Sequence, residues 1–426
     1  MTIRPNARTG RFHDFMVAAR RDRRLVVQPR MGFDHPAVMR SGLIATRGAR
    51  ATTVGTLTLD SFTRVGDFAA VDRALDAGTR LNGYPIVNYG PAFTRAMLDG
   101  VLGADFPIQV RHGSSLPGRI FEALIASGID ASEGGPVSYC LPYGRTPLRR
   151  TVAAWRAAGR GFAALREQGV EPHIETFGGC MLGQLCPPAM LVAISVLEGL
   201  FFARLGIASV SLSYAQQTHP GQDAEAIAAL GSLAAELLPG VEWHIVLYTY
   251  MGMYPETRHG ALGLVADAAR LAAGTGCSRL IVKTAAEADR IPTIAENVEA
   301  LEVAARAAEG APPIPSGTDT GILDQARRLV DAVLGLSGDV GAALIEAFAK
   351  GYLDIPYCLH PDNAGDTASL ITGDGRLEWS RTGALPIPRP GPARRDRLTS
   401  RGLLDALSHV KRRYDARIPP QPKEIP

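Results

Sequence analysis

The stretch His244–Thr284, HIVLYTYMGMYPETRHGALGLVADAARLAAGTGCSRLIVKT, decides the fold. It opens with an apolar run rich in β-branched and aromatic residues, continues with the Ala- and Leu-rich segment ALGLVADAARLAAGTG, and closes with a second apolar run, RLIVKT. Two such runs around a segment of helical period predict a strand–helix–strand unit with parallel strands. Because the same alternation recurs from about residue 50 to 310, the chain predicts an α/β fold.

The chain has about eight such strand–helix units, and their number and spacing are typical of a TIM (β/α)8 barrel. A doubly wound sheet is the main alternative, but no GxGxxG follows the first strand candidate, and polar residues gather where strands end. We expect an N-terminal arm and lead-in strand over 1–50, with LVVQPRMG extended, the barrel over 51–312, and a smaller helical and irregular region over 313–426. The predicted barrel strands are TVGTLTL, YPIVNYG, PIQVRHG, IDASEGG, PHIETFG, SVSLSYA, HIVLYTYMG and RLIVKT.

Composition excludes several classes of protein. The 426 residues are 46% hydrophobic, which is enough for a sizeable core, and 45 Lys and Arg against 42 Asp and Glu leave no polybasic field for nucleic acid. The longest apolar stretch ends at Glu198 and is too short for a membrane span. An odd number of cysteines without a CxxC pair argues against a disulfide framework and predicts a cytoplasmic protein.

Three arginines follow predicted strands on separate segments: Arg30 in QPRMG, Arg64 just after TLTLD, and Arg111 in QVRHG. A barrel brings its strand ends to one face, so these side chains are expected to converge at the mouth. A guanidinium group binds a carboxylate through two parallel hydrogen bonds. Any one of the three alone more often forms a structural salt bridge, but the set, with its Gly-rich flanks, predicts a site for an anionic ligand.

Glu133 ends another predicted strand, beside two glycines in ASEGGPVSY. It can accept hydrogen bonds from a substrate ammonium group, act as a general base, or simply cap the next helix. Tyr139 and Tyr143 follow in SYCLPY, where Pro142 interrupts any helix. Their phenols are expected to project from a loop, either to orient a polar ligand or to pack.

Lys283 ends the strand LIVK, and Glu287 follows one helical turn later. A lysine at this place can form a Schiff base if its surroundings depress its pKa, but Glu287 is expected to keep it charged. His112 has no partner at metal-ligand spacing, and no serine stands in a GxSxG elbow. The predicted site has no evident nucleophile, metal or nucleotide loop, so an external cofactor is expected to supply the difficult chemistry.

Taken together, QPRMG, TLTLDSFTR, LNGYPIVNYG, VRHG, SEGGPVSYCLPY, HIETFG, LIVKTAAEADRIPT, GYLDIPY and DNAG resemble the large (epsilon) subunit of glutamate mutase, also called methylaspartate mutase. The resemblance runs from about residue 25 to 365, with the motifs in the same order. It implies an isomerase, an adenosylcobalamin-dependent carbon-skeleton mutase that interconverts L-glutamate and (2S,3S)-3-methylaspartate by a radical mechanism.

The resemblance also implies roles for residues. An arginine clamp holds the substrate carboxylates, a carboxylate and two tyrosines bind the rest of the substrate, and apolar and polar residues contact the cofactor. The catalytic group would be Glu133, Arg64 and Arg111, with Arg30, Tyr139 and Tyr143 also binding substrate, and Gly32, Lys283, Glu287, Phe177 and Met251 binding cofactor.

The partner implied is a small cobalamin-binding subunit on a separate chain, because the DxHxxG signature that supplies a histidine to cobalt is absent here. A homodimer of this chain within a heterotetramer is expected. Tyr248 and Tyr250 stand where the family carries His and Trp, so a related mutase acting on a modified acidic amino acid is an alternative. A Schiff-base barrel lyase or aldolase using Lys283, and a noncatalytic ligand-binding protein, are the others.

Overall fold

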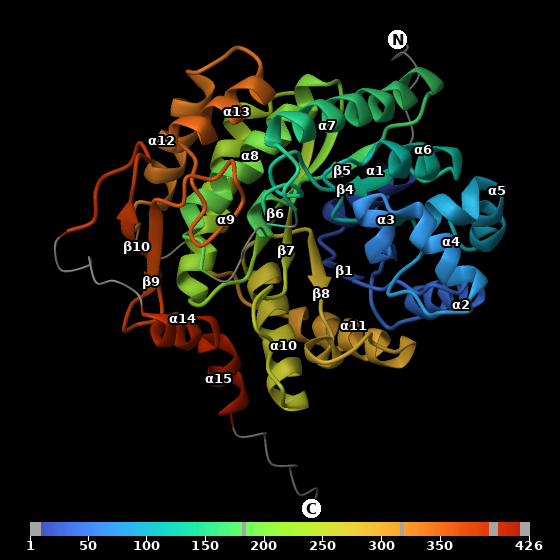
Figure 1. The fold of residues 1–426 in the computed structure, drawn as a ribbon. Coiled ribbons are helices and arrows are strands. Elements are labelled where there is room, and N and C mark those ends of the chain that lie inside the picture. Colours follow the sequence, from blue (N-terminus) through green and yellow to red (C-terminus); the bar gives the residue numbers. More distant parts are fainter. Residues whose placement is uncertain (1–9, 143, 181–184, 316–318, 392–398, 418–426) are drawn as a thin grey trace, which may run out of the picture.

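The structure is a computed structural model that describes residues 10–142, 144–180, 185–315, 319–391 and 399–417. An eight-stranded parallel sheet lies at its centre, surrounded by helices (Figure 1). The strands pair in the order β1-β8-β7-β6-β5-β4-β3-β2, and a parallel bridge between Val27 and Thr53 joins the two ends of this order. The predicted TIM barrel is therefore confirmed. Its strands are β1 (Val26–Pro29), β2 (Gly55–Thr58), β3 (Ile108–Arg111), β4 (Ala131–Glu133), β5 (His173–Glu175), β6 (Ser209–Ala215), β7 (Glu242–Tyr248) and β8 (Arg279–Val282).

Two expectations about strands were wrong. YPIVNYG, predicted as a strand, belongs to helix α5 (Ile86–Leu98), which is kinked at Gly90 before Pro91. A short apolar run fits either type of element, and here Tyr84 makes only an isolated bridge with Leu59. LVVQPRMG, expected to lie ahead of the barrel, contains β1, whose residues pair in parallel with β8.

Helices follow the strands and cover the outside of the barrel (Figure 1). Most are amphipathic, with their apolar faces turned to the sheet. They are α2 (Pro36–Arg47), α3 (Ser61–Val65), α4 (Phe68–Asp76), α5, α6 (Gly118–Ala126), α7 (Leu148–Ala163), α8 (Pro188–Arg204), α9 (Pro220–Leu237), α10 (Arg258–Gly274) and α11 (Ile294–Ala308), with short 3-10 turns at Ala164–Gln168, Gly178–Cys180 and Ala285–Ala288.

Helix α8 is the exception, because it is buried on almost every face. A helix that is apolar all round needs cover on its outer side as well. The C-terminal region supplies it, since α12 (Ile322–Leu334) and α13 (Val340–Lys350) both pack against α8. Beyond them lie the hairpin of β9 (Thr367–Ile371) and β10 (Leu377–Thr382), then α14 (Ser400–Leu407) and α15 (His409–Asp415), which packs on α10.

The amino ends of the strands are closed by helix α1 (Arg11–Arg21). Phe12 is fully buried and stacks on His173 of β5, with ring centroids 4.8 Å apart. The helix also reaches β6, where His13 Nδ1 lies 2.9 Å from Ser209 Oγ. The opposite, carboxyl ends of the strands remain available for a site. Among the described helices, none has both the length and the apolar character needed to cross a membrane.

Candidate active site at the carboxyl ends of the strands

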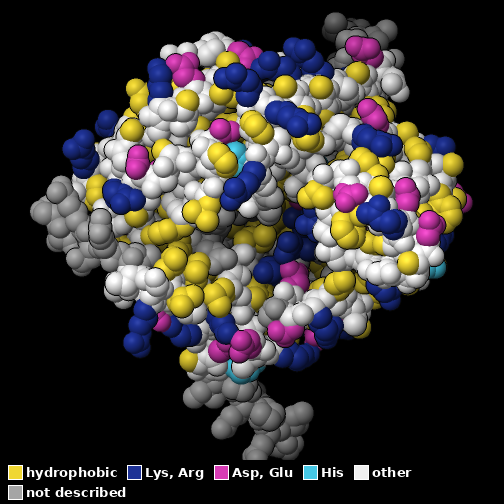
Figure 2. Space-filling model, in the orientation of Figure 1, with side chains coloured by type: hydrophobic (Ala, Val, Ile, Leu, Met, Phe, Trp, Pro, Cys, Tyr) yellow, Lys and Arg dark blue, Asp and Glu magenta, His cyan; other side chains and the backbone are white. Residues whose placement is uncertain are grey.

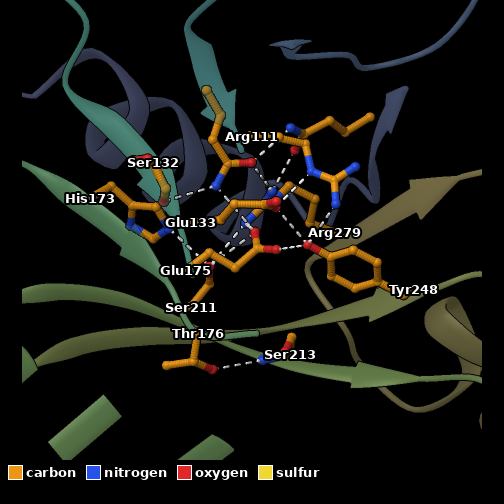
Figure 3. Close-up of polar contacts among 12 residues, drawn as sticks. Arg111, Ser132, Glu133, His173, Glu175, Thr176, Ser211, Ser213, Tyr248 and Arg279 are labelled. Atoms are coloured by element: carbon orange, nitrogen blue, oxygen red, sulfur yellow. Dashed lines mark hydrogen bonds and ion pairs between the residues drawn. The ribbon is translucent and has the colours of Figure 1, made fainter. Parts of the chain in front are cut away.

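Three side chains at the carboxyl ends of β3, β4 and β7 meet inside the barrel mouth (Figure 3). Arg111 Nε donates a hydrogen bond of 2.6 Å to Glu133 Oε2, and the hydroxyl of Tyr248 lies 2.9 Å from the same oxygen. The Arg111 guanidinium carbon also lies 5.3 Å from the centroid of the Tyr248 ring. Because parallel barrel strands end at one face, residues far apart in sequence form one cluster.

The loop after β4 adds a phenol to this cluster. Tyr139 donates a hydrogen bond to Glu133 Oε1, and its ring packs 5.0 Å from that of Phe177. Phe177 also meets the Tyr248 ring edge to face at 5.4 Å. As expected, Tyr139 lies in a turn rather than in a helix. Tyr143, the second predicted phenol, lies outside the described residues.

The surroundings keep both members of the Arg111–Glu133 pair in their charged forms. Burial alone would raise the pKa of Glu133, but Arg111 and hydrogen bonds from Tyr139 and Tyr248 outweigh it and hold that pKa below its usual value. Burial likewise opposes the Arg111 cation, yet Glu133 and the two phenols raise the pKa of Arg111 well above its ordinary value. Both groups are almost inaccessible to solvent. The site therefore presents a buried guanidinium and a buried carboxylate side by side.

A second polar layer lies beneath this pair, deeper in the barrel, and the sequence analysis did not single it out. Arg279 of β8 is fully buried and pairs with Glu175 of β5. Its guanidinium also donates to Ser211 Oγ at 2.9 Å. Gln28 Nε2 bridges Thr56 and Gln109, at 2.9 and 2.8 Å. The signal for this layer was the polar residue at every second position of the strands, as in IQVR and SVSLS, which marks a polar barrel interior.

A further group of charged residues lies at the ends of β1 and β8. Arg30 Nη1 donates to Glu287 Oε2 at 2.6 Å, and Lys283 Nζ lies 4.0 Å from the same oxygen. Lys283 Nζ also lies 4.2 Å from the centroid of the Tyr254 ring. Of the predicted residues, the structure thus brings together Arg30, Lys283 and Glu287 as one set, and Arg111, Glu133, Tyr139 and Phe177 as another.

The surroundings of Lys283 lower its pKa. Burial lowers its pKa to about 8, and Arg30 adds to this effect, although Glu287 opposes it. The loss of hydration on burial is therefore a larger effect on this pKa than the attraction of Glu287. With a pKa of about 8, Lys283 still carries its proton at neutral pH.

Arg64 lies on α3, and its Nε donates to the carbonyl of Leu59 at 3.2 Å. Together with Tyr139 and Arg119 it lines a cavity of 440 Å³. Figure 2 shows a hollow in one face of the molecule, bordered by hydrophobic side chains and containing Lys and Arg side chains. Arg30 and Arg111 thus lie at strand ends with Glu287 and Glu133 as their ion-pair partners, and Arg64 lies on the helix that follows β2.

Two predicted cofactor residues have structural surroundings of their own. At Gly32, a Cβ would lie 2.2 Å from the carbonyl oxygen of Thr58, so the neighbouring strand end already requires a glycine. Met251 is half-buried and packs against the main hydrophobic core. His112 stacks on Trp155 at 5.6 Å, and burial lowers its pKa to about 3, so it is neutral and unsuited to donate a proton.

Tyr248 and Tyr250 have different surroundings. Tyr248 touches Glu133, Glu175 and Arg111 directly. Tyr250, only two residues later, is buried in a separate apolar cluster that includes Tyr414 of α15. Only Tyr248 can therefore act on a ligand beside Glu133.

Comparison with known proteins places the chain in a family. A family model described as methylaspartate mutase E chain matches residues 6–408. The glutamate mutase epsilon subunit of Escherichia coli O157:H7 is 30% identical over 351 residues, covering 78% of this chain and 72% of the relative. That of Halobacterium salinarum is 34% identical over 348 residues, covering 78% and 71%. That of Treponema denticola is 29% identical over 355 residues, covering 78% and 72%. The chain therefore belongs to the methylaspartate mutase E chain family and is an isomerase.

Proposed function

We propose that this chain is the catalytic subunit of an adenosylcobalamin-dependent mutase that interconverts L-glutamate and (2S,3S)-3-methylaspartate by a radical mechanism. The observation that carries the proposal is the buried pair of Arg111 and Glu133 at the barrel mouth. An α-amino acid is a zwitterion, so it can offer a carboxylate to the guanidinium group and an ammonium group to the carboxylate. Entering between the two, it replaces one ion pair by two, which offsets the cost of separating them.

A second substrate carboxylate needs further cations. We propose Arg30, Arg64 and Lys283 for this role beside Arg111, because Arg30 and Lys283 share one carboxylate, Glu287, and Arg111 pairs with Glu133. The excess of positive charge favours a dianionic amino acid over one with an apolar side chain. Arginine suits this task because it binds carboxylates through a planar fork and does not titrate.

The residues proposed for the cofactor fit the ribose of an adenosyl group. Arg30 Nε and Tyr254 OH are buried and have no hydrogen-bond partner within the described residues. Lys283 can donate to a ribose hydroxyl, and Glu287 can accept from one. Phe177, Met251 and Gly32 are proposed as the apolar and close-approach contacts. When bound, adenosylcobalamin supplies the carbon-centred radical, and a separate small cobalamin-binding subunit is the proposed partner, in an assembly with two copies of this chain.

The protein's own part is to position the substrate and exclude water. No acid–base step is assigned to His112, because its pKa of about 3 keeps it neutral. Glu133, held as a carboxylate, accepts hydrogen bonds from the substrate ammonium group while the fragment migrates. Fixed charges of this kind lower the barrier by orienting the reacting atoms, not by titrating.

One observation favours a second candidate function. Burial lowers the pKa of Lys283 to about 8, which leaves part of it as a nucleophilic amine in mildly alkaline solution. A lyase or aldolase would use this amine to form a Schiff base. Borohydride treatment in the presence of substrate would then attach the substrate covalently to Lys283, and absence of the adduct excludes this function.

The deciding assay mixes the full chain with a cobalamin-binding small subunit, coenzyme B12 and L-glutamate, and follows 3-methylaspartate. A product other than 3-methylaspartate from a modified acidic amino acid, with glutamate inert, would replace glutamate as the substrate. Arg111→Lys and Arg64→Lys are each expected to lose on the order of 10²-fold in turnover, because a point charge replaces a bidentate fork.

A matched control is Arg327→Lys, which alters a surface pair between Arg327 and Glu236 and should leave turnover unchanged. Glu133→Gln should slow the reaction and leave cofactor affinity nearly unchanged. Near-normal turnover in both Arg64→Lys and Arg111→Lys would refute the carboxylate clamp.

A further inference from the structure

The cavity of 440 Å³ beside Arg64 has cations but no carboxylate in its lining. In addition to Arg64 on α3, Arg119 on α6 and Arg150 on α7 line it, and no described aspartate or glutamate does. The neutral polar side chains in the lining are hydroxyl groups, from Thr63, Ser114, Ser115, Tyr139 and Thr146. Three arginines that share one cavity with hydroxyl donors form a site suited to an anion.

Two of the three arginines keep their hydrogen-bond donors available. Neither Arg119 nor Arg150 forms an ion pair within the described part of the chain. The Arg119 guanidinium carbon lies 4.6 Å from the centroid of the Phe68 ring, which also lines the cavity. A contact with a ring face holds the guanidinium group in place without an acceptor, so its N–H groups remain for a ligand. Asp60 and Asp67, at either end of α3, instead accept from the backbone N–H groups that begin α3 and α4.

The N-terminus of α6 adds backbone donors to the same cavity. This helix has 9 residues, begins at Gly118 after Pro117, and has no side-chain cap. The N–H groups of the first turn have no partner within a helix, and the helix dipole favours an anion beside them. Arg119 and Ile120, which belong to this first turn, both line the cavity. The start of α6 therefore reinforces the attraction of the arginines for an anion.

An unsatisfied buried hydroxyl is an independent indication of a ligand. Thr63 lines the cavity from α3 and is only 1% exposed. Its Oγ1 has no hydrogen-bond partner within the described residues. A buried hydroxyl without a partner costs free energy, so such a group in the wall of a cavity indicates a ligand that supplies the missing hydrogen bond.

We propose that this cavity binds a tetrahedral oxyanion of the phosphate type, beside the Arg111–Glu133 pair. The oxygens of such an anion point in four directions, so they can accept from Arg119, Arg150 and Thr63 and from the first turn of α6. A planar carboxylate has two oxygens and cannot serve donors on so many sides. The site extends beyond the proposed mutase function, which assigns no role to these three side chains.

The oxyanion site shares two residues with the proposed substrate site. Arg64 belongs to the proposed carboxylate clamp, and Tyr139 both lines the cavity and donates to Glu133. This link, unlike the binding itself, rests on the proposed function: an oxyanion that occupies Arg64 should compete with the substrate carboxylate. In the mutase assay, phosphate should therefore raise the KM for glutamate and leave kcat unchanged. Inhibition that lowers kcat alone would contradict the link.

Binding is measured on the full chain alone, by isothermal titration calorimetry with inorganic phosphate at constant ionic strength. Saturable binding of one phosphate per chain is expected. Sulfate, which has the same shape, should bind at the same site, whereas acetate should bind about tenfold more weakly or less, because it is planar and singly charged. Arg119→Gln and Arg150→Gln are each expected to weaken phosphate binding about fivefold or more, since each removes a cation from the cavity.

Thr63→Val tests the unsatisfied hydroxyl with a side chain of nearly the same shape. It is expected to weaken phosphate binding about threefold or more, because the ligand loses a hydrogen-bond donor. Thermal unfolding without phosphate should show no loss of stability, since the hydroxyl has no partner to lose within the described residues. Unchanged phosphate affinity in Thr63→Val would contradict the contact.

Arg160→Gln is the matched control for the two arginine variants. Like Arg150 it is exposed and lies on α7, but it does not line the cavity. The change in net charge is the same, and phosphate affinity should stay within about twofold of wild type because exposed, distant charges are screened.

Equal weakening in Arg160→Gln, or binding that does not saturate, would overturn the proposal and reduce it to general attraction to a positive surface. Unchanged affinity in both Arg119→Gln and Arg150→Gln would overturn it as well. The titration requires neither cobalamin nor turnover. Its failure is therefore separate from failure of the mutase assay.

Discussion

At position 32, close contact with a neighbouring backbone requires the residue to be glycine. Its Cα faces the end of β2, where an added Cβ would meet the Thr58 carbonyl oxygen at 2.2 Å. Because a backbone group cannot turn aside as a side chain can, Gly32→Ala is expected to destabilise the protein by about 1–3 kcal/mol. Chemical denaturation measures this. Gly161→Ala, at an exposed position of helix α7 with nothing within 4 Å, should leave stability unchanged or raise it by about 0.5 kcal/mol.

The pKa of Lys283 is the second prediction at this scale. With ¹³C-labelled lysine, its Cε signal should titrate near pH 8, because burial outweighs the attraction of Glu287. Glu287→Gln should lower this pKa further, since it removes the group that favours the cation. Lys350 is an internal control, because its hydrogen bond to Glu346 raises its pKa. Titration of Lys283 at the ordinary lysine pKa would contradict the prediction.

The same shift has a consequence for stability. Between pH 8 and the unfolded value of 10.5, the unfolded chain holds a proton at Lys283 that the folded chain has released. The contribution of this residue should therefore make folding more favourable as pH rises through that window.

At the scale of elements, helix α8 positions the loop that carries Tyr139. Glu198 lies in the middle of α8, and its Oε1 accepts from the backbone N–H groups of Val137 and Ser138, at 3.1 and 2.9 Å. Its other oxygen accepts from the Ser138 hydroxyl at 2.9 Å. A Cβ at Gly135 would overlap the Glu198 carboxyl group, so the glycine allows the helix and loop to meet. The Glu198 carboxyl group, in an otherwise apolar helix, thus holds in place the loop that carries Tyr139.

Burial raises the pKa of Glu198 to about 7, despite opposing hydrogen bonds from Ser138 and Val137. The folded protein therefore holds a proton that the unfolded chain loses near pH 4.5, and this contribution to stability is lost as pH rises toward 7. Relative to Glu198→Gln, wild-type stability should fall across this window by at most roughly 1.4 kcal/mol per pH unit. Thermal unfolding from pH 4.5 to 8 measures it.

The control is Glu236, whose contribution to stability should change with pH in the opposite direction to that of Glu198. Exposed Glu236 pairs with Arg327, which lowers its pKa, so its contribution is lost as pH falls. Glu236→Gln should therefore leave the decline between pH 4.5 and 7 in place. A Glu198→Gln variant with the same pH dependence as wild type would show that Glu198 stays ionised in the folded protein.

At the scale of the whole molecule, the barrel is closed at its amino end by α1 and is open to ligands at its carboxyl end. Phe12 is the centre of this closure: it is fully buried, stacks on His173, and lies under the Arg279 guanidinium at 5.1 Å. Phe12→Ala would leave a cavity at the base of the barrel and should cost about 3–5 kcal/mol of unfolding free energy. Val17→Ala on the exposed side of the same helix should cost less than about 0.5 kcal/mol.

Denaturant unfolding of both variants tests the closure, and equal small losses would mean that α1 is dispensable for the barrel. The division between the barrel and the C-terminal region at residue 313 stays a prediction. The packing of α12 and α13 on α8 shows why that region accompanies the barrel, since it covers the outer face of an apolar helix.

Much of the fold could be predicted because its signals are local. Period-two and period-3.6 patterns of apolar residues are properties of short segments, and they identified seven of the eight expected strands, with YPIVNYG the error. The placement of Arg111, Glu133 and Lys283 at strand ends followed from the same patterns together with the geometry of a parallel barrel. Membership of β1 in the barrel did not follow, because a strand inside a sheet and an extended lead-in have the same local pattern.

By itself, then, the sequence determined the class of fold, the residues available at the barrel mouth, and the family resemblance carried by their order along the chain. The tertiary structure alone decided which charges pair: Arg111 with Glu133, Arg30 with Glu287, and Arg279 with Glu175. It also decided that burial would control the pKa of Lys283 and that His173 would join two serines of β6 inside the barrel. These outcomes depend on strand register, closure and exclusion of water, which act between residues as many as 257 positions apart and leave no trace in a local pattern.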